Sequence, residues 1–377
     1  MRVALVHDWL VTFGGGELVL AQLLRLFPEA RVFTLLDHMA GADRAGLGIP
    51  RQVTTSFLQH MPGVASRHRY YLPLYPAAVR SLDVSGYDLV ISVSHAAAKN
   101  VRIRPGQRHV CYCLSPMRYA WDLRDQYLAQ TGLDRGVRGW LAHRLLDRMR
   151  AWDLEGTHGV TEFVTLSHFV ADRIRRAYGR DSTVVHPPVD TRFFTPGPAS
   201  AAARDPALYV TAGRLVPYKR IDMIARAFAR LPDRRLVIIG TGPELRRVRE
   251  AAGPNVELLG FLPREELRDH LRRARAFLFA AEEDFGISPL EAQACGAPVI
   301  AYARGGALET IRGLDSPEPT GVFFEEQTVD SLVDAVRRFE GRERIAPAAC
   351  RTNAERFAAE RFVSAIRETF DGRTVGG

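Results

Sequence analysis

The sequence predicts an α/β protein made of two doubly wound parallel sheets, each in its own domain. At 377 residues the chain is longer than a single hydrophobic core usually organises. Short apolar runs typical of buried strands alternate with amphipathic helical patterns in both halves. A stretch rich in Pro, Ala and Gly at 196–206 has no periodic apolar face and is typical of a linker. We therefore expect one domain at 1–195 and a second at 196–377, with the last helix a candidate to pack back on the first.

The first half begins with an apolar strand at 3–6, a glycine turn at 14–16 and a helix at 17–26. Further apolar runs predict its remaining strands, at 89–93, 110–113, 164–166 and 184–186. The second half repeats the pattern, with strands expected at 208–211, 236–239, 256–259, 276–279 and 299–301. Each of these is followed by a helical pattern, so the intervening loops should gather at the carboxyl edge of a sheet, where open α/β folds bind ligands.

Residues 283–298 form the most informative segment, because two carboxylates flank a glycine turn and the start of a helix. Gly286 allows close backbone approach, and Pro289 suits the first turn of a helix, whose unpaired N–H groups and positive dipole end attract a phosphate. Glu291 can accept two hydrogen bonds from a vicinal diol such as a ribose, while Glu283 lies before the turn. The segment indicates a site for a phosphorylated, polyhydroxylated ligand; the alternative is a surface helix with a Glu in its first turn.

A second segment, 213–222, supports that interpretation. It follows the expected strand at 208–211 and precedes an amphipathic helix, so Arg214 and Lys219 lie in a strand-to-helix loop. Both cations can reach a diphosphate at the carboxyl edge of the sheet. A single Arg or Lys in a loop is usually only solvated, but the two together with the glutamate turn favour a binding site.

Several further motifs accompany these segments. The second half carries Gly-Arg-Leu-x-x-x-Lys-Arg-x-Asp at 213–222, Gly-Thr-Gly-Pro at 240–243, Leu-Gly-Phe-Leu at 259–262 and Gly-Gly-Ala-Leu-Glu-Thr at 305–310. The first half carries Val-His-Asp-Trp-Leu at 6–10, Gly-Gly-Gly-Glu at 14–17, Ser-His-Ala at 94–96 and Tyr-Cys-Leu-Ser-Pro-Met-Arg-Tyr-Ala-Trp-Asp at 112–122. With these motifs the chain resembles retaining glycosyltransferase family four over nearly its whole length. Its first half more narrowly resembles bacterial mannosyltransferases that build lipopolysaccharide O-antigen and exopolysaccharide.

The resemblance implies a GT-B fold, in which two Rossmann-like domains face a central cleft. It also implies transfer of an α-mannosyl group from GDP-mannose, with retention of configuration, to a lipid-linked oligosaccharide acceptor in cell-surface polysaccharide synthesis. A glycosyltransferase that uses another nucleotide sugar, with UDP, dTDP or GDP-fucose, is an alternative. Two other classes stay open, a nucleotide-sugar epimerase and a binding protein without catalysis.

The resemblance further assigns roles, with Glu283 beside the donor sugar and Glu291 on the ribose. The catalytic candidates are Glu283, Arg214, Lys219 and His95. The donor-binding candidates are Gly15, Gly16, Gly213, Arg214, Lys219, Gly240, Gly242, Phe261, Leu262, Glu283, Phe285, Gly286, Ile287, Ser288 and Glu291. The acceptor-side candidates are His7, Asp8, Trp9, Arg118 and Tyr119.

One position departs from the pattern of the family. Related sequences often have a His, assigned to the donor sugar, where this chain has Leu114, which cannot form a side-chain hydrogen bond. His95, after the strand at 89–93, is the candidate to take that part, and His7 with Asp8 at the end of the first strand is another. A single His is nevertheless more often a capping or packing residue than a catalytic one.

The sequence gives reason to expect chemistry without a metal. It contains no Asp-x-Asp, the pair with which many glycosyltransferases bridge Mg²⁺ or Mn²⁺ to a diphosphate. Arg214, Lys219 and a helix N-terminus would then neutralise the leaving diphosphate. We therefore expect no cofactor beyond the nucleotide-sugar donor.

The chain is basic, with a formal net charge of +8, and its arginines are spread along helices. No zinc-finger spacing, basic zipper or aromatic RNA-binding signature occurs, so a nucleic-acid partner is not expected. Two segments, 67–76 and 138–152, interleave basic and aromatic residues as interfacial segments do, which favours peripheral contact with an anionic membrane. The alternative is that these aromatics are core and the arginines are solvated.

The remaining features predict an enzyme of the cytoplasm, peripheral on the inner face of the plasma membrane. The N-terminal apolar run is too short for a signal peptide, and no stretch has the length of a transmembrane helix. The four cysteines show no metal-ligand spacing, so reduced thiols are expected.

Overall fold

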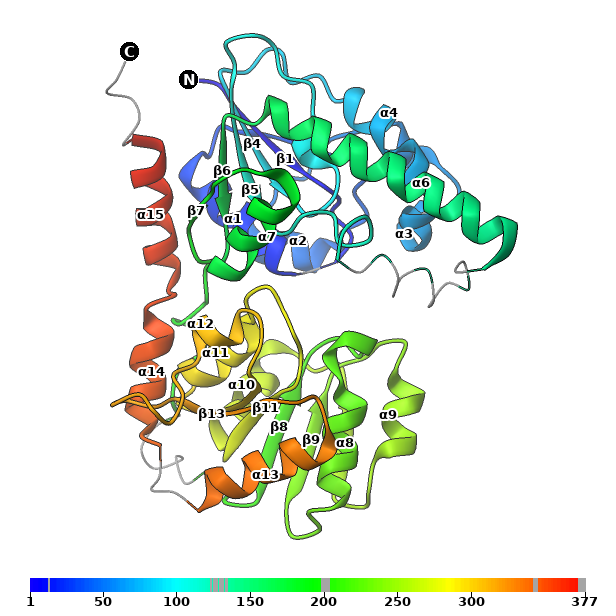
Figure 1. The fold of residues 1–377 in the computed structure, drawn as a ribbon. Helices are drawn as coiled ribbons and strands as arrows, with labels where there is room; N and C mark the ends of the chain where they lie inside the picture. Colours follow the sequence, from blue (N-terminus) through cyan, green and yellow to red (C-terminus); the bar gives the residue numbers. More distant parts are fainter. Residues whose placement is uncertain are drawn as a thin grey trace. The chain divides into compact units, whose positions relative to one another are not determined.

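The computed structural model describes residues 1–12, 14–122, 124, 128, 132, 135–197, 204–341 and 345–371. The chain divides into two compact units (Figure 1). The first comprises Met1–Pro187 together with the chain from Phe362 onward, and the second is Pro188–Arg361. Each unit is an α/β layer structure with its own parallel sheet, as the sequence predicts.

The first unit contains a seven-stranded sheet in the order β3-β2-β1-β4-β5-β6-β7, in which every pairing is parallel. Its strands are β1 (Val3–His7), β2 (Arg31–Thr34), β3 (Thr54–Thr55), β4 (Leu89–Ser94), β5 (Arg108–Cys113), β6 (Glu162–Thr165) and β7 (Thr183–Val184). The central strands β1 and β4 are buried along their whole length, because helices cover both faces of a parallel sheet.

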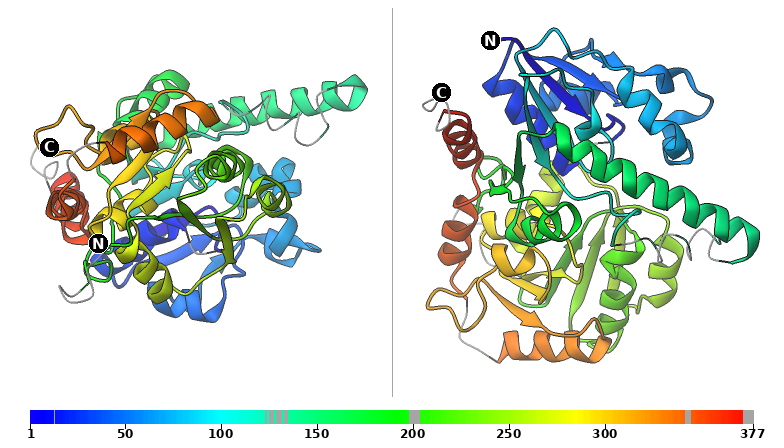
Figure 2. Two further views of the ribbon diagram at one scale, coloured as in Figure 1. Left: turned by 90° about the horizontal axis from the view of Figure 1, so that it is seen from below. Right: turned by 45° about the horizontal axis from the view of Figure 1, so that its top comes forward.

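The helices of this unit divide between the two faces of its sheet. They are α1 (Gly15–Leu26), α2 (Gly41–Leu47), α3 (Val64–Arg67), α4 (Tyr75–Arg80), α6 (Gly136–Glu155) and α7 (His168–Tyr178), with α15 (Ala359–Asp371) at the end of the chain. Short 3₁₀ turns include η2 (His68–Leu74) and η3 (Ala98–Asn100). One core cluster joins the sheet to α3, α4 and α6, whereas α1 packs on β1 and β4. Figure 2 shows that α6 projects from the body of its own unit.

The second unit contains a six-stranded parallel sheet in the order β10-β9-β8-β11-β12-β13. Its strands are β8 (Leu208–Ala212), β9 (Arg235–Ile239), β10 (Val256–Gly260), β11 (Ala276–Phe279), β12 (Val299–Tyr302) and β13 (Gly321–Phe324). Its helices are α8 (Ile221–Ala229), α9 (Leu245–Ala251), α10 (Arg264–Arg273), α11 (Ile287–Ala294), α12 (Ala307–Thr310), α13 (Val329–Glu340) and α14 (Pro347–Glu355). One core cluster packs α8 and α13 on the sheet, and a second packs α10, α11 and α14 on its other face, so this unit is doubly wound.

The division between the units differs from the one expected at 195/196. Residues before that point already pack in the second unit, because Arg351 donates hydrogen bonds to the carbonyls of Thr191 and Phe194, and Arg272 donates to that of Thr195. The chain therefore divides at Pro187. Of the expected linker, residues 198–203 lie outside the described residues.

The last helix, α15, carries the chain back to the first unit. The ring of Phe370 meets that of Phe27 with centroids 5.6 Å apart, and the ring of Phe362 meets that of Tyr112 at 5.9 Å. The guanidinium of Arg108 also lies over the Phe370 ring, at 5.5 Å. Two edge-to-face aromatic contacts and one cation–π contact thus fix the helix by burial rather than by charge alone.

Three strands were not anticipated from the sequence. β2 begins with an arginine, β3 has only two residues, and β13 begins with a glycine, so none of them is a long apolar run. The ten anticipated strands are all present, with ends that differ by at most a few residues. All four cysteines are free and buried. No helix of the described residues is both long enough and apolar enough to cross a membrane.

Candidate functional site

The two basic and two acidic candidates of the second unit follow its strands at the carboxyl edge of the sheet. Lys219, in the loop after β8, places its Nζ 2.9 Å from Oε1 of Glu283, which follows β11. Both side chains are largely buried, at 14% and 19% exposure. Burial alone would lower the pKa of Lys219, but the adjacent Glu283 carboxylate outweighs it and raises that pKa. Lys219 is therefore a fixed cation at this edge.

Arg214 lies in the same loop but is exposed. Within the described ranges, no residue forms an ion pair or hydrogen bond with its guanidinium. The end of the loop is strained, because Arg220 adopts φ +51°, the one positive φ outside glycine among the described residues. The loop thus holds Lys219 as an anchored cation and Arg214 as a free one, while Nε of Arg220 lies 3.7 Å from Oδ1 of Asp222.

The glycine turn before α11 has the geometry expected of an anion site. Gly286 has φ +91° and caps the N-terminus of the eight-residue helix. In the described part of the chain, nothing accepts a hydrogen bond from the backbone N–H of Ile287 or Ser288. Phe285 itself is 4% exposed and its ring packs on Phe357, so its side chain is not available to a ligand. The open N–H groups and the helix dipole favour a negative charge here.

Gly305 and Gly306, which precede α12, pack against the backbone of this turn. A Cβ on Gly305 would lie 2.4 Å from the carbonyl oxygen of Glu283, and one on Gly306 would lie 2.3 Å from Cα of Phe285. The N–H of Gly306 donates a 2.8 Å hydrogen bond to the same Glu283 carbonyl. The Gly-Gly motif that precedes α12 is therefore required by close backbone contact rather than by a ligand.

The same reasoning explains the glycines after β8 and β9. Gly240 has φ +135°, and a Cβ on it would lie 1.9 Å from the carbonyl oxygen of Gly213. A Cβ on Gly242 would lie 2.3 Å from the carbonyl oxygen of Leu215. The two loops also share hydrogen bonds from Gly213 N–H to the Ile239 carbonyl and from Leu215 N–H to the Thr241 carbonyl, both 2.9 Å. These glycines set the course of the loop that carries Arg214 and Lys219.

Glu291, on α11, has an unusual protonation equilibrium. Burial, with the Asp190 carboxylate nearby, raises the pKa of Glu291 to about 7, against the opposing effects of Arg264 and Lys219. Arg264 in turn donates a 2.8 Å hydrogen bond to Asp190. Neither Asp190 nor Arg264 was among the candidates, because no sequence motif links them to Glu291.

We expect Glu291→Gln to stabilise the ligand-free protein at pH 8 and to change it little at pH 5. The folded-state pKa lies above the ordinary value of 4.5, so the folded state holds a proton that the unfolded chain releases. The contribution of the Glu291 carboxyl to the free energy of unfolding therefore falls as the pH rises from about 4.5 to about 7, and it stays at that lower value above pH 7. Melting temperatures at the two pH values test this, with an expected gain on the order of 2–6 °C at pH 8 only. Equal shifts at both pH values would contradict it.

The first unit has a different arrangement at the carboxyl end of β1. Asp8 is fully buried and accepts backbone hydrogen bonds of 2.6–3.0 Å from the N–H groups of His95, Ala96, Ala97 and Ala98. Burial alone would raise the pKa of Asp8, but His95 and the backbone N–H groups hold it well below its usual value. Asp8 was expected on the acceptor side; the structure instead buries it as the anchor of the loop after β4.

His95 is held at the surface of this unit. Its Nδ1 lies 2.9 Å from Oδ2 of Asp8, and its ring meets that of Trp9 edge to face at 4.5 Å. Its side chain is 34% exposed, whereas Trp9 is 8% exposed. Of the two histidines considered, His95 is therefore the one that a ligand can reach.

His7 is buried at 1% exposure and pairs with Glu17, whose Oε1 lies 3.4 Å from its Nε2. Burial would lower the pKa of His7, but the Glu17 carboxylate raises it overall. Gly15 and Gly16 belong to α1, and a Cβ on Gly16 would lie 2.8 Å from Cδ1 of Leu114. The glycine here allows close packing on Leu114. Glu17, in the first turn of α1, was not among the candidates, although the Gly-Gly-Gly-Glu motif contains it.

The other candidates occupy varied environments. Arg118 and Tyr119 are half-buried, and burial raises the pKa of the Tyr119 hydroxyl. In the second unit Phe261 is 79% exposed and Leu262 half-buried, in the turn between β10 and α10. An apolar ring so exposed is free to contact a ligand.

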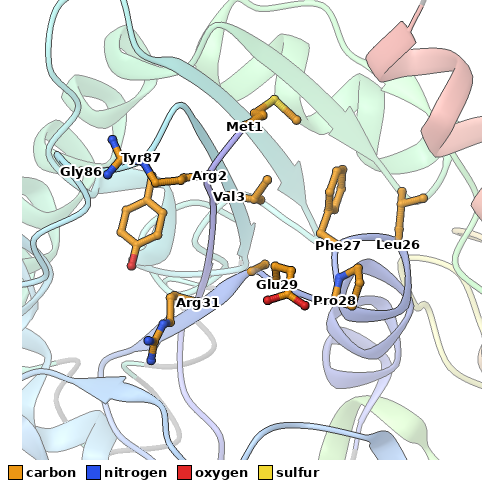
Figure 3. Close-up of a pocket in the computed structure, with 11 residues that line it drawn as sticks. Met1, Arg2, Val3, Leu26, Phe27, Pro28, Glu29, Arg31, Gly86 and Tyr87 are labelled. Atoms are coloured by element: carbon orange, nitrogen blue, oxygen red, sulfur yellow. The ribbon is translucent and has the colours of Figure 1, made fainter.

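No group of three or more His, Cys, Asp or Glu residues among the described residues is arranged to hold a metal ion. The first unit has a hollow of about 490 Å³ at the amino end of β1, lined by Val3, Phe27, Glu29, Arg31 and Tyr87 with their neighbours (Figure 3). That hollow is at the opposite sheet edge from Asp8 and His95.

Comparison with known proteins addresses the second half of the chain most directly. Residues 198–357 match the family model "Glycosyl transferases group 1". A D-inositol 3-phosphate glycosyltransferase of Geodermatophilus obscurus is 36% identical over 217 residues, 50% of this chain and 47% of its own. A GDP-mannose-dependent alpha-(1-6)-phosphatidylinositol monomannoside mannosyltransferase of Mycolicibacterium smegmatis is 34% identical over 197 residues, 45% of this chain and 50% of its own. The matches thus span about half the length of these relatives.

Solved structures match over nearly the whole chain. Anabaena HepE, in complex with UDP and glucose, has a TM-score of 0.70 at 19% identity and covers 98% of this chain and 100% of its own. Sucrose-phosphate synthase of Thermosynechococcus elongatus has a TM-score of 0.71 at 18% identity, with 99% of each chain covered. At such identities these neighbours establish the fold. The comparisons therefore show that residues 198–357 match the glycosyl transferases group 1 model, in a chain that shares the two-domain GT-B fold of these neighbours.

Proposed function

We propose that this protein transfers an α-mannosyl group from GDP-mannose, with retention of configuration, to a lipid-linked oligosaccharide acceptor in cell-surface polysaccharide synthesis. The observation that carries the proposal is the Lys219–Glu283 pair beside the open N-terminus of α11, with Arg214 free in the same loop. This arrangement offers two cations and a helix dipole to a diphosphate, and a carboxylate to the sugar it carries.

The proposed reaction breaks the bond between the sugar C1 and the diphosphate oxygen. Negative charge grows on that oxygen as the bond breaks, and Arg214, Lys219 and the N–H groups of Ile287 and Ser288 stabilise it. The acceptor hydroxyl attacks C1 from the face that the diphosphate leaves, and its proton passes to the departing diphosphate. The protein supplies the positive charge from its own side chains, so we propose that no metal is required.

The donor is proposed from the relatives together with Glu291. Two relatives are named as GDP-mannose-dependent mannosyltransferases, and each matches just under half of this chain, at 45% and 44%. Glu291 would bind the ribose hydroxyls as an ionised carboxylate. Because its pKa in the free protein is about 7, donor affinity should fall as the pH drops below neutrality.

The first unit would receive the acceptor. The same two relatives act on phosphatidylinositol mannosides, which are lipid-linked saccharides. His95, oriented by Asp8 and Trp9, is the side chain of this unit that we propose to hydrogen-bond a sugar hydroxyl. With Asp8 accepting from Nδ1, the Nε2 of His95 is left to accept from that hydroxyl.

We further propose peripheral contact of the first unit with an anionic membrane at the inner face of the plasma membrane. In the segment 67–76, Tyr70 is 80% exposed, although Tyr75 belongs to the core at 1%. In α6, Trp140 is 58% and Leu141 56% exposed, although Trp152 belongs to the core. The apolar exposed residues stand among exposed arginines, and such surfaces suit the interface of a bilayer.

Replacing Arg67, Arg69 and Arg138 by Ser should reduce co-sedimentation with vesicles that contain phosphatidylglycerol. All three are exposed. Each basic residue near an anionic surface contributes on the order of 1 kcal/mol, so attachment should weaken about a hundredfold and be sensitive to salt. A matched control replaces three exposed arginines of the second unit, Arg246, Arg249 and Arg337, and should leave vesicle binding unchanged. Absence of vesicle binding by the unmodified protein at low salt would contradict the proposal.

The proposed activity is tested by incubating the protein with GDP-mannose, GDP-fucose, UDP-glucose or a dTDP-sugar, with and without a prenyl-diphosphate-linked acceptor. We expect GDP-mannose to be consumed only when the acceptor is present. Conversion of a nucleotide sugar in the absence of acceptor would instead indicate an epimerase. Tight binding of GDP with no turnover of any sugar would indicate a binding protein.

A further inference from the structure

Two fully buried side-chain amides lie behind the glutamate turn of the second unit. Asn353 on α14 donates from Nδ2 to Oε1 of Gln293 on α11, at 2.7 Å, and to the carbonyl of Thr310, at 2.9 Å. Gln293 donates from Nε2 to the same Thr310 carbonyl, at 3.0 Å. Arg356 donates to Oδ1 of Asn353, at 3.0 Å. Gln293, Thr310 and Asn353 are all 0% exposed, so each of these bonds replaces one that water would otherwise provide.

The amides hold the C-terminal end of α12. Thr310 is its last residue, and its carbonyl has no partner within so short a helix, so the two amides satisfy it. From the other end of α12, Gly306 donates its N–H to the carbonyl of Glu283. The Thr310 hydroxyl bonds the Gly306 carbonyl at 3.1 Å. One continuous set of hydrogen bonds therefore runs from α14 through α12 to the backbone of Glu283.

The same amides also hold α11, which carries Glu291. Gln293 follows Glu291 by two residues on this helix, and a difference of two residues turns the side chains to different faces. Gln293 points into the core while Glu291 is half-buried. In Figure 1, α11 and α12 lie beside α14, in agreement with their packing.

We propose that the Gln293–Asn353 pair is a positioning element that fixes the Glu283 and Glu291 carboxylates relative to each other. The pair holds both carboxylates. It is hydrogen-bonded to α12, which is linked to the backbone of Glu283, and Gln293 lies on α11, the helix that carries Glu291. A donor that must meet one carboxylate with its sugar and the other with its ribose depends on that spacing. The inference rests on the proposed function for its kinetic readout, and a displacement of about 1 Å in such a site can cost roughly a hundredfold in rate.

The test compares Asn353→Leu, Gln293→Leu and the double variant. Each single change removes the hydrogen bond between the two amides but keeps one amide donor to the Thr310 carbonyl, so both should lower Tm and kcat. The double change replaces both amides by apolar groups of similar size but leaves the buried Thr310 carbonyl without either donor, so Tm should recover only in part. If the pair positions the carboxylates, kcat of the double variant stays at least tenfold below that of the unmodified protein. Recovery of kcat together with Tm would overturn the inference and leave the pair merely structural.

Gln107→Leu is the matched control. Gln107 is 8% exposed and donates to the carbonyls of Val84 and Tyr87 in the first unit, at 2.7 and 2.8 Å. Its loss should lower Tm but leave kcat within about twofold. Hydrogen exchange at the Gly306 amide gives a readout that needs no activity, and the double variant should exchange it at least tenfold faster. Unchanged exchange there would overturn the inference, whereas failure of the unmodified protein to transfer any sugar would overturn only the proposed function.

Discussion

Replacing Arg214 or Lys219 by Ala should lower kcat by about 10²–10³-fold, the usual loss when one group that stabilises a developing anion is removed. The two cations differ before the diphosphate binds. Arg214 is exposed, whereas Lys219 is paired with Glu283 at 2.9 Å. Arg214 is free to move to the ligand, whereas Lys219 must share its charge between Glu283 and the leaving group. Both losses should appear in kcat rather than in KM alone.

The two variants should differ in stability. Arg214→Ala removes an exposed side chain, so Tm should change by about 2 °C or less. Lys219→Ala leaves the Glu283 carboxylate, 19% exposed, without its partner, which costs roughly 1–3 kcal/mol. Melting curves and turnover measured on the same preparations separate the effects. If kcat falls only in proportion to the folded fraction, both residues are structural.

Gly306→Ala should abolish most of the activity although it adds only a methyl group. Gly306 has an ordinary helical backbone conformation, at φ −64°, so an alanine is not strained by its own dihedral angles. Its Cβ would, however, lie 2.3 Å from Cα and 2.7 Å from N of Phe285, both of them backbone atoms. The turn that carries Glu283 must move, and a displacement near 1 Å is expected to reduce kcat by roughly a hundredfold.

Gly46→Ala is the control for that variant. Gly46 lies in α2, has no positive φ, and a Cβ on it would meet nothing within 4 Å. An alanine should stabilise this helix by up to about 1 kcal/mol and leave kcat unchanged. A Gly306→Ala protein with wild-type kcat would mean that the position of the 283–285 turn does not limit the reaction.

The strands of the fold could be predicted where burial on both faces gives an unbroken apolar run, as in β1, β4 and β8. β3 could not, because two residues of an edge strand give no pattern. The boundary at 195/196 was wrong for a physical reason. Composition identified a stretch poor in periodic apolar residues. The backbone carbonyls of the segment before it, however, accept hydrogen bonds from the side chains of Arg351 and Arg272.

The residues of the site likewise divide into those that the sequence could predict and those that it could not. Gly286, Glu283 and Lys219 could be found because a turn, a helix start and a loop are local features of the sequence. Asp190 and Arg264 could not, since they approach Glu291 only when separate segments pack. Asp8 was assigned to a ligand because it follows a strand, although its carboxylate is taken up by backbone N–H groups.

The most direct test of the account is a proton NMR record of the sugar product formed from GDP-mannose and a lipid-linked acceptor in the presence of EDTA. We predict release of GDP and an α-linked mannosyl product at the same rate with and without the chelator, because Arg214, Lys219 and the N-terminus of α11 provide the positive charge. A β-linked product would contradict retention. Loss of transfer in EDTA that Mn²⁺ restores would contradict the claim that these groups of the protein suffice.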